Sequence, residues 1–429
     1  MRVGRASVAI LVGSLLVLGL GAAAPKGVGD RALYTAAELA AIMAHSPPPR
    51  PPADPTDHVA DDPRAAAFGR VLFFDGKLSL DGTISCVTCH KPALAFTDGR
   101  ALAKGLSVGT RNAPSLLEAA NNHWFFWDGR ADSLWSQVLQ VIENPREFGS
   151  DRLHVAHAVD ADASLRRAYE EIFGPLPPLA DTARFPPHGR PGADVNAPAV
   201  RTWQAMATAD RDAIDRVFSN IGKAIEAYER SLAARISPFD VYVEGLKTGD
   251  RAKLALLSPA AKRGLKLFVG AGHCDLCHSG PDFSDGEFHD IGLPLLAGEA
   301  PDDGRADGIR EVQVNPFNTA GRFSDDRTAD RDQLAYLPSP DSQRGAFKTP
   351  SLRNVALTAP YMHDGRFATL RDVLDFYAKG KAGSRGTLIG QREETLALVP
   401  HFTQRQISDL IAFLQRLDGE PPAQAMAQP

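Results

Sequence analysis

Two copies of one short motif constrain this sequence more than any other feature. The chain has four cysteines, and all of them lie in the segments Cys86-Val87-Thr88-Cys89-His90 and Cys274-Asp275-Leu276-Cys277-His278. This Cys-x-x-Cys-His pattern is how a c-type haem is attached. Two thiols three residues apart lie on one helical turn and can form thioethers with one porphyrin, and the adjacent histidine then faces the iron. The sequence therefore predicts two covalent c-type haems, with His90 and His278 as proximal iron ligands.

Paired cysteines have three other common uses. Two structural disulfides would suit an exported protein, but they give no reason for a histidine after each pair. A four-cysteine zinc site needs its pairs about 15–20 residues apart, whereas these pairs lie in different halves of the chain. Thioredoxin-like redox motifs rarely occur twice with a histidine after each copy. Haem attachment accounts for all four cysteines and both histidines.

The start of the chain has the pattern of an export signal. Arg2 and Arg5 precede the apolar run Val8–Leu20, and the small residues Gly21–Ala24 follow it. A charged start, an apolar stretch and a small-residue cleavage site are typical of a secretory signal peptide. A membrane anchor is the alternative, although a run of about 13 residues is short for a bilayer, which needs roughly 20. We expect a signal peptide over 1–24 and a periplasmic protein without stable membrane insertion.

Composition narrows the class of protein further. Acidic residues outnumber basic ones, 52 against 47, and the formal net charge is −5. Nucleic-acid-binding domains normally carry a basic excess, so we expect no nucleic-acid partner. A chain of 429 residues with 44% hydrophobic residues is long and apolar enough for two or three folded domains.

The two motifs lie in segments that repeat each other. Ala65–Phe73 before the first motif matches Ala260–Phe268 before the second in Ala, Ala, Gly, Leu and Phe, at a constant spacing of 195 residues. A second repeat, at a spacing of 236 residues, pairs Pro114-Ser115-Leu116 with Pro350-Ser351-Leu352, Asp128-Gly129-Arg130 with Asp364-Gly365-Arg366, and Leu134 with Leu370. We predict two cytochrome c-like haem domains related by duplication, over 25–235 and 236–420, and a tail over 421–429.

Hydrophobic periodicity favours an all-α fold. Apolar residues recur at three- and four-residue intervals in the segments Leu153–Phe173, Arg211–Leu232, Ser258–Phe268, Leu370–Tyr377 and Gln404–Leu417. Leu176–Ala199 is rich in proline and glycine and is expected to be a loop or insertion. Glu299–Ser342, which is rich in glycine and aspartate, is expected to be a long excursion within the second domain.

The second repeat also pairs residues that differ chemically. Trp127 corresponds to His363, and Val141 corresponds to Tyr377. If the helices that carry Val141 and Tyr377 cover the outer faces of the haems, Tyr377 can reach an iron and Val141 cannot. The first haem would then have an open position for a small ligand, and the second would be closed by a protein oxygen. An open haem performs chemistry, and a closed one transfers electrons.

Two polar residues lie on or just after the helix expected over the open haem, Gln137 and Glu147. Peroxide cleavage needs a group that takes a proton from one oxygen and returns it to the other, and a carboxylate held close to the haem can serve. For Glu147, a surface ion pair with Arg146 is the alternative.

These motifs resemble those of the bacterial dihaem cytochrome c peroxidases and their MauG-type relatives, over roughly residues 55–420. The resembling segments are Thr110-Arg111-Asn112-Ala113-Pro114, Phe126-Trp127-Asp128-Gly129-Arg130 with Gln137 and Glu147, Leu352-Arg353-Asn354, and Thr358-Ala359-Pro360-Tyr361-Met362-His363-Asp364-Gly365. The resemblance implies that the first domain is peroxidatic and that the second transfers electrons.

The same resemblance implies roles for individual residues. Trp127 matches a tryptophan between the haems that relays electrons, although a tryptophan in such an aromatic run also packs in cores. Gln137 and Glu147 match residues of the peroxidatic pocket. Three residues match the ligands of an inter-haem calcium ion, namely Asn112, Thr358 and Pro360, the last two through backbone oxygens, and oxygen donors suit this hard cation.

The sequence departs from the family pattern in two places. Members that need reductive activation carry a displaceable histidine in the loop after the first haem, and Lys91–Arg111 contains none. Many peroxidases have a methionine as the outer ligand of the electron-transfer haem. This chain has Tyr377 at that position, and MauG-type proteins are similar to it in having a tyrosine there. Met362 is the rival ligand. An oxygen ligand should lower the potential of that haem, since axial ligands tune haem potentials over about 0.8 V.

Three functions follow from these expectations. The first is a peroxidase that reduces hydrogen peroxide with electrons from a small c-type cytochrome or a cupredoxin, a small copper protein. The second is a MauG-like enzyme that uses peroxide to oxidise side chains of a partner protein, which Tyr377 favours. The third is a non-catalytic electron carrier, which would need two closed haems. A homodimer is left open.

Overall fold

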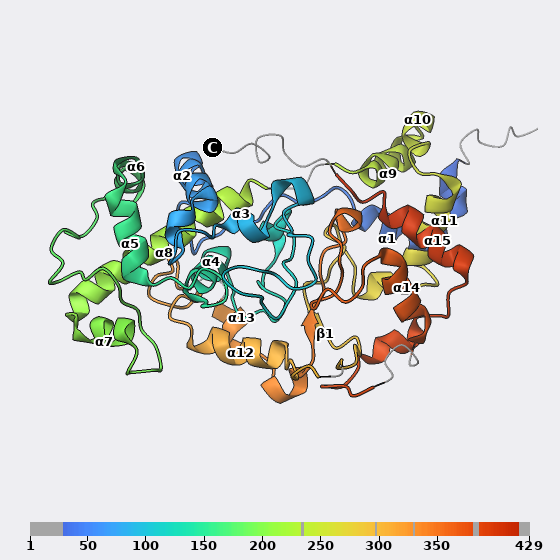
Figure 1. Cartoon of the computed structure of the whole chain (residues 1–429). Coiled ribbons are helices and arrows are strands. Elements are labelled where there is room, and N and C mark those ends of the chain that lie inside the picture. Colours follow the sequence, from blue (N-terminus) through green and yellow to red (C-terminus); the bar gives the residue numbers. More distant parts are fainter. Residues whose placement is uncertain (1–28, 233–235, 297, 329–330, 381–385, 420–429) are drawn as a thin grey trace, which may run out of the picture.

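The computed structural model describes residues 29–232, 236–296, 298–328, 331–380 and 386–419 (Figure 1). The predicted signal peptide over 1–24 and the tail over 421–429 lie outside these ranges. Within them, no helix has the length and apolar character needed to cross a bilayer.

The described residues are mostly helical, as predicted. Two short antiparallel strands, β1 (Phe288–His289) and β2 (Phe347–Lys348), pair Phe288 with Lys348 and His289 with Phe347. The α-helices are α1 (Ala36–Ala44), α2 (Pro63–Phe74), α3 (Cys86–Cys89), α4 (Leu134–Glu143), α5 (Arg152–Ala161), α6 (Ala163–Phe173), α7 (Pro198–Ala205), α8 (Thr208–Arg230), α9 (Pro238–Thr248), α10 (Arg251–Leu254), α11 (Pro259–Val269), α12 (Arg305–Val314), α13 (Arg331–Ala335), α14 (Leu370–Ala378) and α15 (Gln404–Leu414).

The helix predictions differ from the structure mainly at one position. The predicted helix over Leu153–Phe173 is two helices, α5 and α6, because Asp162 leaves the helical conformation between them. The Asp162 carboxylate instead accepts hydrogen bonds from the backbone N–H groups of Ser164 and Leu165, which caps α6. The predicted excursion over Glu299–Ser342 contains α12 and α13.

The first hydrophobic core is centred on α2 and α8. Gly69 of α2 lies directly on the backbone of α8, since a Cβ at this position would be 1.7 Å from the carbonyl oxygen of Ala224. Phe68 and Leu72 of α2 and Phe218 of α8 are buried beside this contact. The close approach fixes the helix that leads into the first haem motif.

The second core repeats this arrangement with α11 and α15. A Cβ at Gly264 of α11 would be 2.0 Å from the carbonyl oxygen of Asp409 on α15. Leu265, Phe268 and Phe413 are buried around it. In Figure 1, the first core lies on the left around α2 and α8, and the second lies on the right around α11 and α15.

Two segments pack against the half of the chain to which they do not belong in sequence. Residues of the N-terminal segment join the second core, where Ile42 is buried and the hydroxyls of Tyr34 and Tyr242 lie 2.9 Å apart. In the opposite direction, Phe317 and Phe323 after α12 are buried in the first core. The two halves are therefore interleaved rather than joined at a single boundary.

Candidate haem-binding active site

One large cavity is lined by most of the predicted site residues. Its volume is about 1220 Å³, above the range of roughly 300–1,000 Å³ for an ordinary single-ligand pocket. Of the predicted site residues, those that line it are Cys89, His90, Asn112, Trp127, Gln137, Glu147, Cys274, Cys277, His278, Thr358, Pro360 and Tyr377, together with Val141, Met362 and His363. Cys86 packs instead against the first core.

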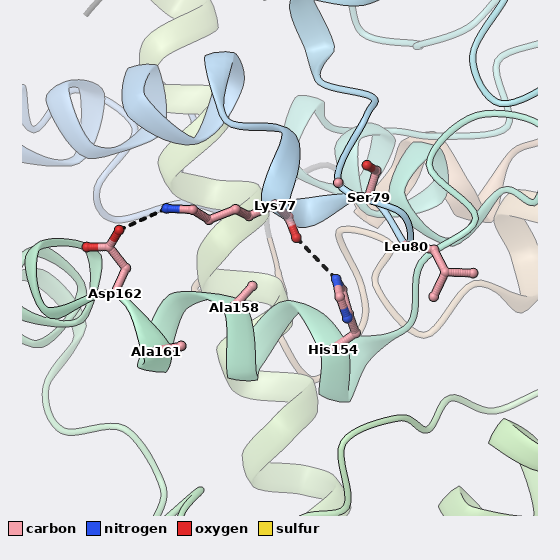
Figure 2. Close-up of a pocket in the computed structure, with 8 residues that line it drawn as sticks. Lys77, Ser79, Leu80, His154, Ala158, Ala161 and Asp162 are labelled. Atoms are coloured by element: carbon pink, nitrogen blue, oxygen red, sulfur yellow. Dashed lines mark hydrogen bonds and ion pairs between the residues drawn. The ribbon is translucent and has the colours of Figure 1, made fainter.

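A second, smaller cavity has a different character. It has a volume of about 390 Å³ and lies between the turn after α2 and helix α5. Its polar groups are already paired, since Lys77 Nζ lies 2.9 Å from Asp162 and His154 Nε2 lies 3.1 Å from the Lys77 carbonyl oxygen (Figure 2). None of the predicted site residues lines it, so we place the functional site in the large cavity.

The two proximal histidines are held in the same way. His90 Nδ1 donates to the carbonyl oxygen of Phe96 (3.0 Å), and His278 Nδ1 donates to that of Phe283 (2.9 Å). Phe96 and Phe283 both have positive φ, at 57° and 52°, so the backbone that supplies each acceptor has the same form. A fixed Nδ1–H leaves Nε2 free to bind a metal. Burial lowers the pKa of both histidines, which keeps the rings neutral as ligation requires.

The four cysteines are free thiols rather than disulfides in the structure. Cys86 and Cys89 occupy the single turn of α3, and Cys274 begins a short 3-10 turn that ends before Cys277. Burial raises the pKa of Cys89 to about 11 and that of Cys274 to about 12. Each pair lies beside its histidine in or next to the cavity, and this donor set fits a covalently bound haem at each motif.

Glu147 has the setting of a proton-transfer group. Its side chain is half-buried at the cavity, and its Oε1 accepts a hydrogen bond from Asn144 Nδ2 (2.7 Å). Burial raises the pKa of Glu147, and the positive charge of Arg130 and the Asn144 hydrogen bond oppose that rise. The predicted alternative, an ion pair with Arg146, does not form: Arg146 bonds the carbonyl oxygen of Val108.

The loop after the first haem motif is fastened to the segment that carries Glu147. The Leu106 N–H donates to the carbonyl oxygen of Glu147 (3.1 Å), and the Ser107 N–H donates to that of Arg146 (3.0 Å). Gly105 leaves no space there, because a Cβ would be 2.7 Å from the Glu147 Cα. This loop lacks a histidine, and its backbone is tied to the segment that carries Glu147.

Trp127 is held from both halves of the protein. Its Nε1 donates to the carbonyl oxygen of Asn112 (3.0 Å), and its own carbonyl oxygen accepts from the Lys348 N–H of β2 (2.8 Å). The Asn112 N–H in turn donates to the carbonyl oxygen of His363 (2.7 Å). Backbone groups from both halves therefore hold Trp127 at the cavity.

Tyr377 and Val141 occupy matching helices. Tyr377 lies on α14 and Val141 on α4, and both side chains line the cavity. Burial raises the pKa of Tyr377, and nearby Cys277 and Cys274 raise it further. The rival residue Met362 also lines the cavity, in a turn where its φ is 75°.

The three candidate calcium ligands line the same cavity. Asn112 is buried, and its Nδ2 donates to the carbonyl oxygen of Arg100 (2.7 Å), which leaves Oδ1 as an available acceptor. Thr358 and Pro360 approach from the second half of the chain.

Sequence reasoning missed several charged groups at the cavity, among them Lys348 and Glu118. Lys348 lies in β2, its Nζ donates to Asn122 Oδ1 (2.9 Å), and burial lowers its pKa to about 8. Glu118 is buried within 4.0 Å of Arg353, and burial raises its pKa to about 8. Lys348 lies 236 residues after Asn112, so the second repeat could have identified it. Glu118 lies 236 residues before Asn354, so the same repeat pairs it with the Leu352-Arg353-Asn354 segment.

Comparisons with known proteins agree with this geometry. A model of the di-haem cytochrome c peroxidase family matches residues 63–248. The methylamine utilization protein MauG of Methylorubrum extorquens is 32% identical over 385 residues, which cover 89% of this chain and 84% of that protein. The cytochrome-c peroxidase IdrP1 of Denitromonas iodatirespirans is 33% identical, covering 91% of this chain and 92% of its own length.

A solved structure supports the same assignment. A MauG-like protein associated with microbial copper homeostasis matches with a TM-score of 0.61 and 27% sequence identity, covering 90% of this chain and 97% of that one. The chain therefore belongs to the dihaem cytochrome c peroxidase family, and it is an oxidoreductase that carries two c-type haems and acts on peroxide.

Proposed function

We propose that this protein reduces hydrogen peroxide to water with electrons from an external donor, a small c-type cytochrome or a cupredoxin. The observation that carries this proposal is the Glu147 carboxyl, which is held by Asn144 at the cavity that His90 also lines. On this side of the cavity α4 offers Val141, which cannot bind an iron.

A haem bound through Cys86, Cys89 and His90 would supply the iron at which peroxide is cleaved. Glu147 takes a proton from one peroxide oxygen and returns it to the leaving oxygen. Its raised pKa suits the return step, since a carboxyl that keeps its proton to higher pH is a better acid near neutrality. Gln137, on the cavity face of α4, would orient peroxide through its side-chain amide.

Electrons would enter through the second motif and cross at Trp127. Its hydrogen bond to Asn112 and its backbone contact with β2 support this role, since they fix the indole between the two halves. Tyr377 would close the iron held by His278 and restrict that haem to electron transfer. Met362 is the competing ligand.

The second candidate function is a MauG-like oxidation of side chains on a partner protein. Tyr377 favours it, because a tyrosine at this position is the MauG-type pattern and would stabilise oxidised iron. The peroxide chemistry at Glu147 is common to both functions, and the source of electrons separates them.

The two haem domains, over 25–235 and 236–420, are proposed to derive from one ancestral domain. In support, Gly69 and Gly264 make the same backbone contact at equivalent positions, and the acceptors of both proximal histidines share one conformation. The N-terminal segment around Ile42 precedes the first haem motif in sequence but packs in the core of the second domain. The first domain therefore contributes a segment to the second.

Three further features belong to this proposal. A calcium ion would bind Asn112, Thr358 and Pro360 between the haems. The export pattern over 1–24 would deliver the protein to the periplasm, where small redox proteins are available. The protein is also proposed to form a homodimer, although the site itself is complete within one chain.

Two measurements test the proposal. The ferric protein should show one high-spin and one low-spin haem, whereas two low-spin haems would indicate a non-catalytic electron carrier. Peroxide should then oxidise a reduced small cytochrome or cupredoxin over many turnovers. Failure with such donors, together with peroxide-dependent oxidation of a partner protein, would favour the MauG-like function.

A further inference from the structure

Two tryptophans lie three residues apart at the cavity, in opposite electrostatic settings. Trp127 donates its Nε1–H to the carbonyl oxygen of Asn112 (3.0 Å). Trp124 is buried, and the guanidinium carbon of Arg305 lies 3.9 Å from the centre of its ring. Both side chains line the large cavity.

Arg305 is held firmly in this position. It lies at the start of α12 and is 2% exposed, with its guanidinium carbon also 4.0 Å from the ring centre of Phe288 on β1. Its Nη1 donates to the carbonyl oxygen of Gly129 (2.7 Å). Burial lowers the pKa of Arg305 to about 10, which still leaves it positively charged at neutral pH. The charge is therefore a fixed feature of the Trp124 environment.

The two settings shift the ease of oxidation in opposite directions. An indole that loses an electron becomes a cation, and a guanidinium against its face attracts the neutral ring but repels the oxidised one. A carbonyl oxygen at the indole N–H has the reverse effect, since its negative end stabilises the positive charge. The interaction at Trp124 is screened little by solvent, because Trp124 and Arg305 are both buried.

We propose that Arg305 is a positioning residue that makes Trp124 hard to oxidise and so confines electron transfer to Trp127. This inference rests on the proposed function, in which Trp127 is the relay. Arg305 also fixes the turn that follows Trp127, through its hydrogen bond to Gly129.

The packing of α12 supports this second effect. A Cβ at Gly308 would be 2.0 Å from the carbonyl oxygen of Asp128, and a Cβ at Gly129 would be 2.4 Å from Arg305 Nη1. The excursion in the second half of the chain thus clamps the aromatic turn of the first half.

Loss of the charge should open a side reaction. Peroxide takes up two electrons and two protons to give two waters. If Trp124 supplies the two electrons, it releases two protons and gains one oxygen from water, so that tryptophan and peroxide give hydroxytryptophan and water. The readout is a mass gain of one oxygen on the peptide that carries Trp124.

The test uses the holoenzyme with both haems, treated with limiting peroxide in the absence of an electron donor. We expect Trp124 to be oxygenated at least fivefold more in Arg305→Gln than in the wild type. Arg305→Lys, which keeps the charge, should stay near the wild-type level. Equal oxygenation in the wild type and Arg305→Gln, or in the Lys and Gln variants, would overturn the proposal.

A second variant covers the case in which Arg305→Gln does not retain its haems. In Trp127→Phe, Arg305 is intact, so Trp124 should stay unmodified although the relay is lost. Strong oxygenation of Trp124 in this variant would contradict the protective effect of Arg305. If Trp127→Phe keeps full turnover with an electron donor, Trp127 is not the electron relay. This result does not depend on whether Trp124 is modified.

Discussion

In both haem-binding halves, an aromatic turn closed by an isolated bridge leads into a helix, α4 in the first half and α14 in the second, and the side chains on the two helices differ. Helices α4 and α14 each begin after a hydroxyl N-cap, Ser133 in one and Thr369 in the other. The aromatic turn before each helix has a residue with positive φ at the same place, Phe126 at 65° and Met362 at 75°. Isolated antiparallel bridges close both turns in the same register. The scaffold is therefore repeated even where the sequence is not.

The differences fall on the cavity faces of these helices. α4 offers Gln137 and Val141, and the residues at the equivalent positions of α14 are Val373 and Tyr377. One face combines a polar group with a side chain that cannot bind iron, and the other combines an apolar group with a phenol. The proposed division of labour between the two sites therefore rests on these side chains, and exchanging them tests it.

Removal of the carboxylate should have the largest effect. In Glu147→Gln, we expect peroxide turnover to fall by about 10²–10⁴-fold, the usual contribution of a general acid–base group. The haem spectra should be unchanged, because the glutamine amide has a volume similar to that of the carboxyl and can still face Asn144. The matched control is Glu171→Gln, an exposed carboxylate on α6, and it should turn over like the wild type.

The pH profile provides a further check on this variant. Burial raises the Glu147 pKa, and the step that takes up a proton needs the ionised form, so activity should fall as the pH drops through that raised pKa. The fall should disappear in Glu147→Gln. A limb of the profile that persists in the variant would assign the titration to another group.

Exchange of the outer residue should convert the first site toward the second. In Val141→Tyr, we expect a phenol from α4 to reach the iron held by His90, as proposed for Tyr377 on α14. The high-spin signal should be lost, and peroxide turnover should fall by about 10²-fold, the smaller of the two limits given for Glu147→Gln. Val141→Leu is the control, since it adds volume without a ligand. If the high-spin signal remains in Val141→Tyr, the two helices do not lie equivalently over their haems.

The second site is tested by replacing Tyr377, the proposed outer ligand of the haem held by His278. Tyr377→Met should raise the potential of the second haem on the order of 0.2 V, within the range of about 0.8 V over which axial ligands act. Redox titration followed by the low-spin spectrum measures this shift. An unchanged spectrum and potential would exclude Tyr377 as a ligand and favour Met362, whose replacement by leucine should then open the site.

The sequence predicted the parts of this site that depend on local chemistry. The haem motifs specify their own geometry, and the spacing of the repeats brought Val141 and Tyr377 to matching helices. The junction between α5 and α6 was missed because Leu153–Phe173 keeps its apolar periodicity across Asp162, whose capping role is seen only in three dimensions. Periodicity describes a buried face and does not report a single residue that leaves the helix.

Long-range packing was not predictable in the same way. Nothing in the residues around Ile42 indicates that they join the second core, since apolar residues do not specify which core they enter. Arg305 lies in a segment expected to be an excursion, and its role depends on rings contributed by Trp124 and Phe288. Such contacts between distant segments leave no pattern in a single sequence.

The smallest effect is expected from the paired glycines, and it tests whether the shared scaffold is equivalent in both halves. Gly69→Ala and Gly264→Ala each place a methyl group within 2.0 Å of a backbone oxygen of the facing helix, so the helices must move apart. Overpacking of this kind costs about 1–3 kcal/mol, and each variant should lower the thermal midpoint of unfolding. Gly29→Ala is the control, because its φ is −67° and its Cβ would meet only Leu254 Cδ1, at an ordinary contact distance of 3.7 Å. Since each glycine lies on the helix that leads into one motif, haem release on heating should begin at the first site in Gly69→Ala and at the second in Gly264→Ala. Equal loss of both haems in each variant would mean that the interleaved segments make the two cores unfold as one unit.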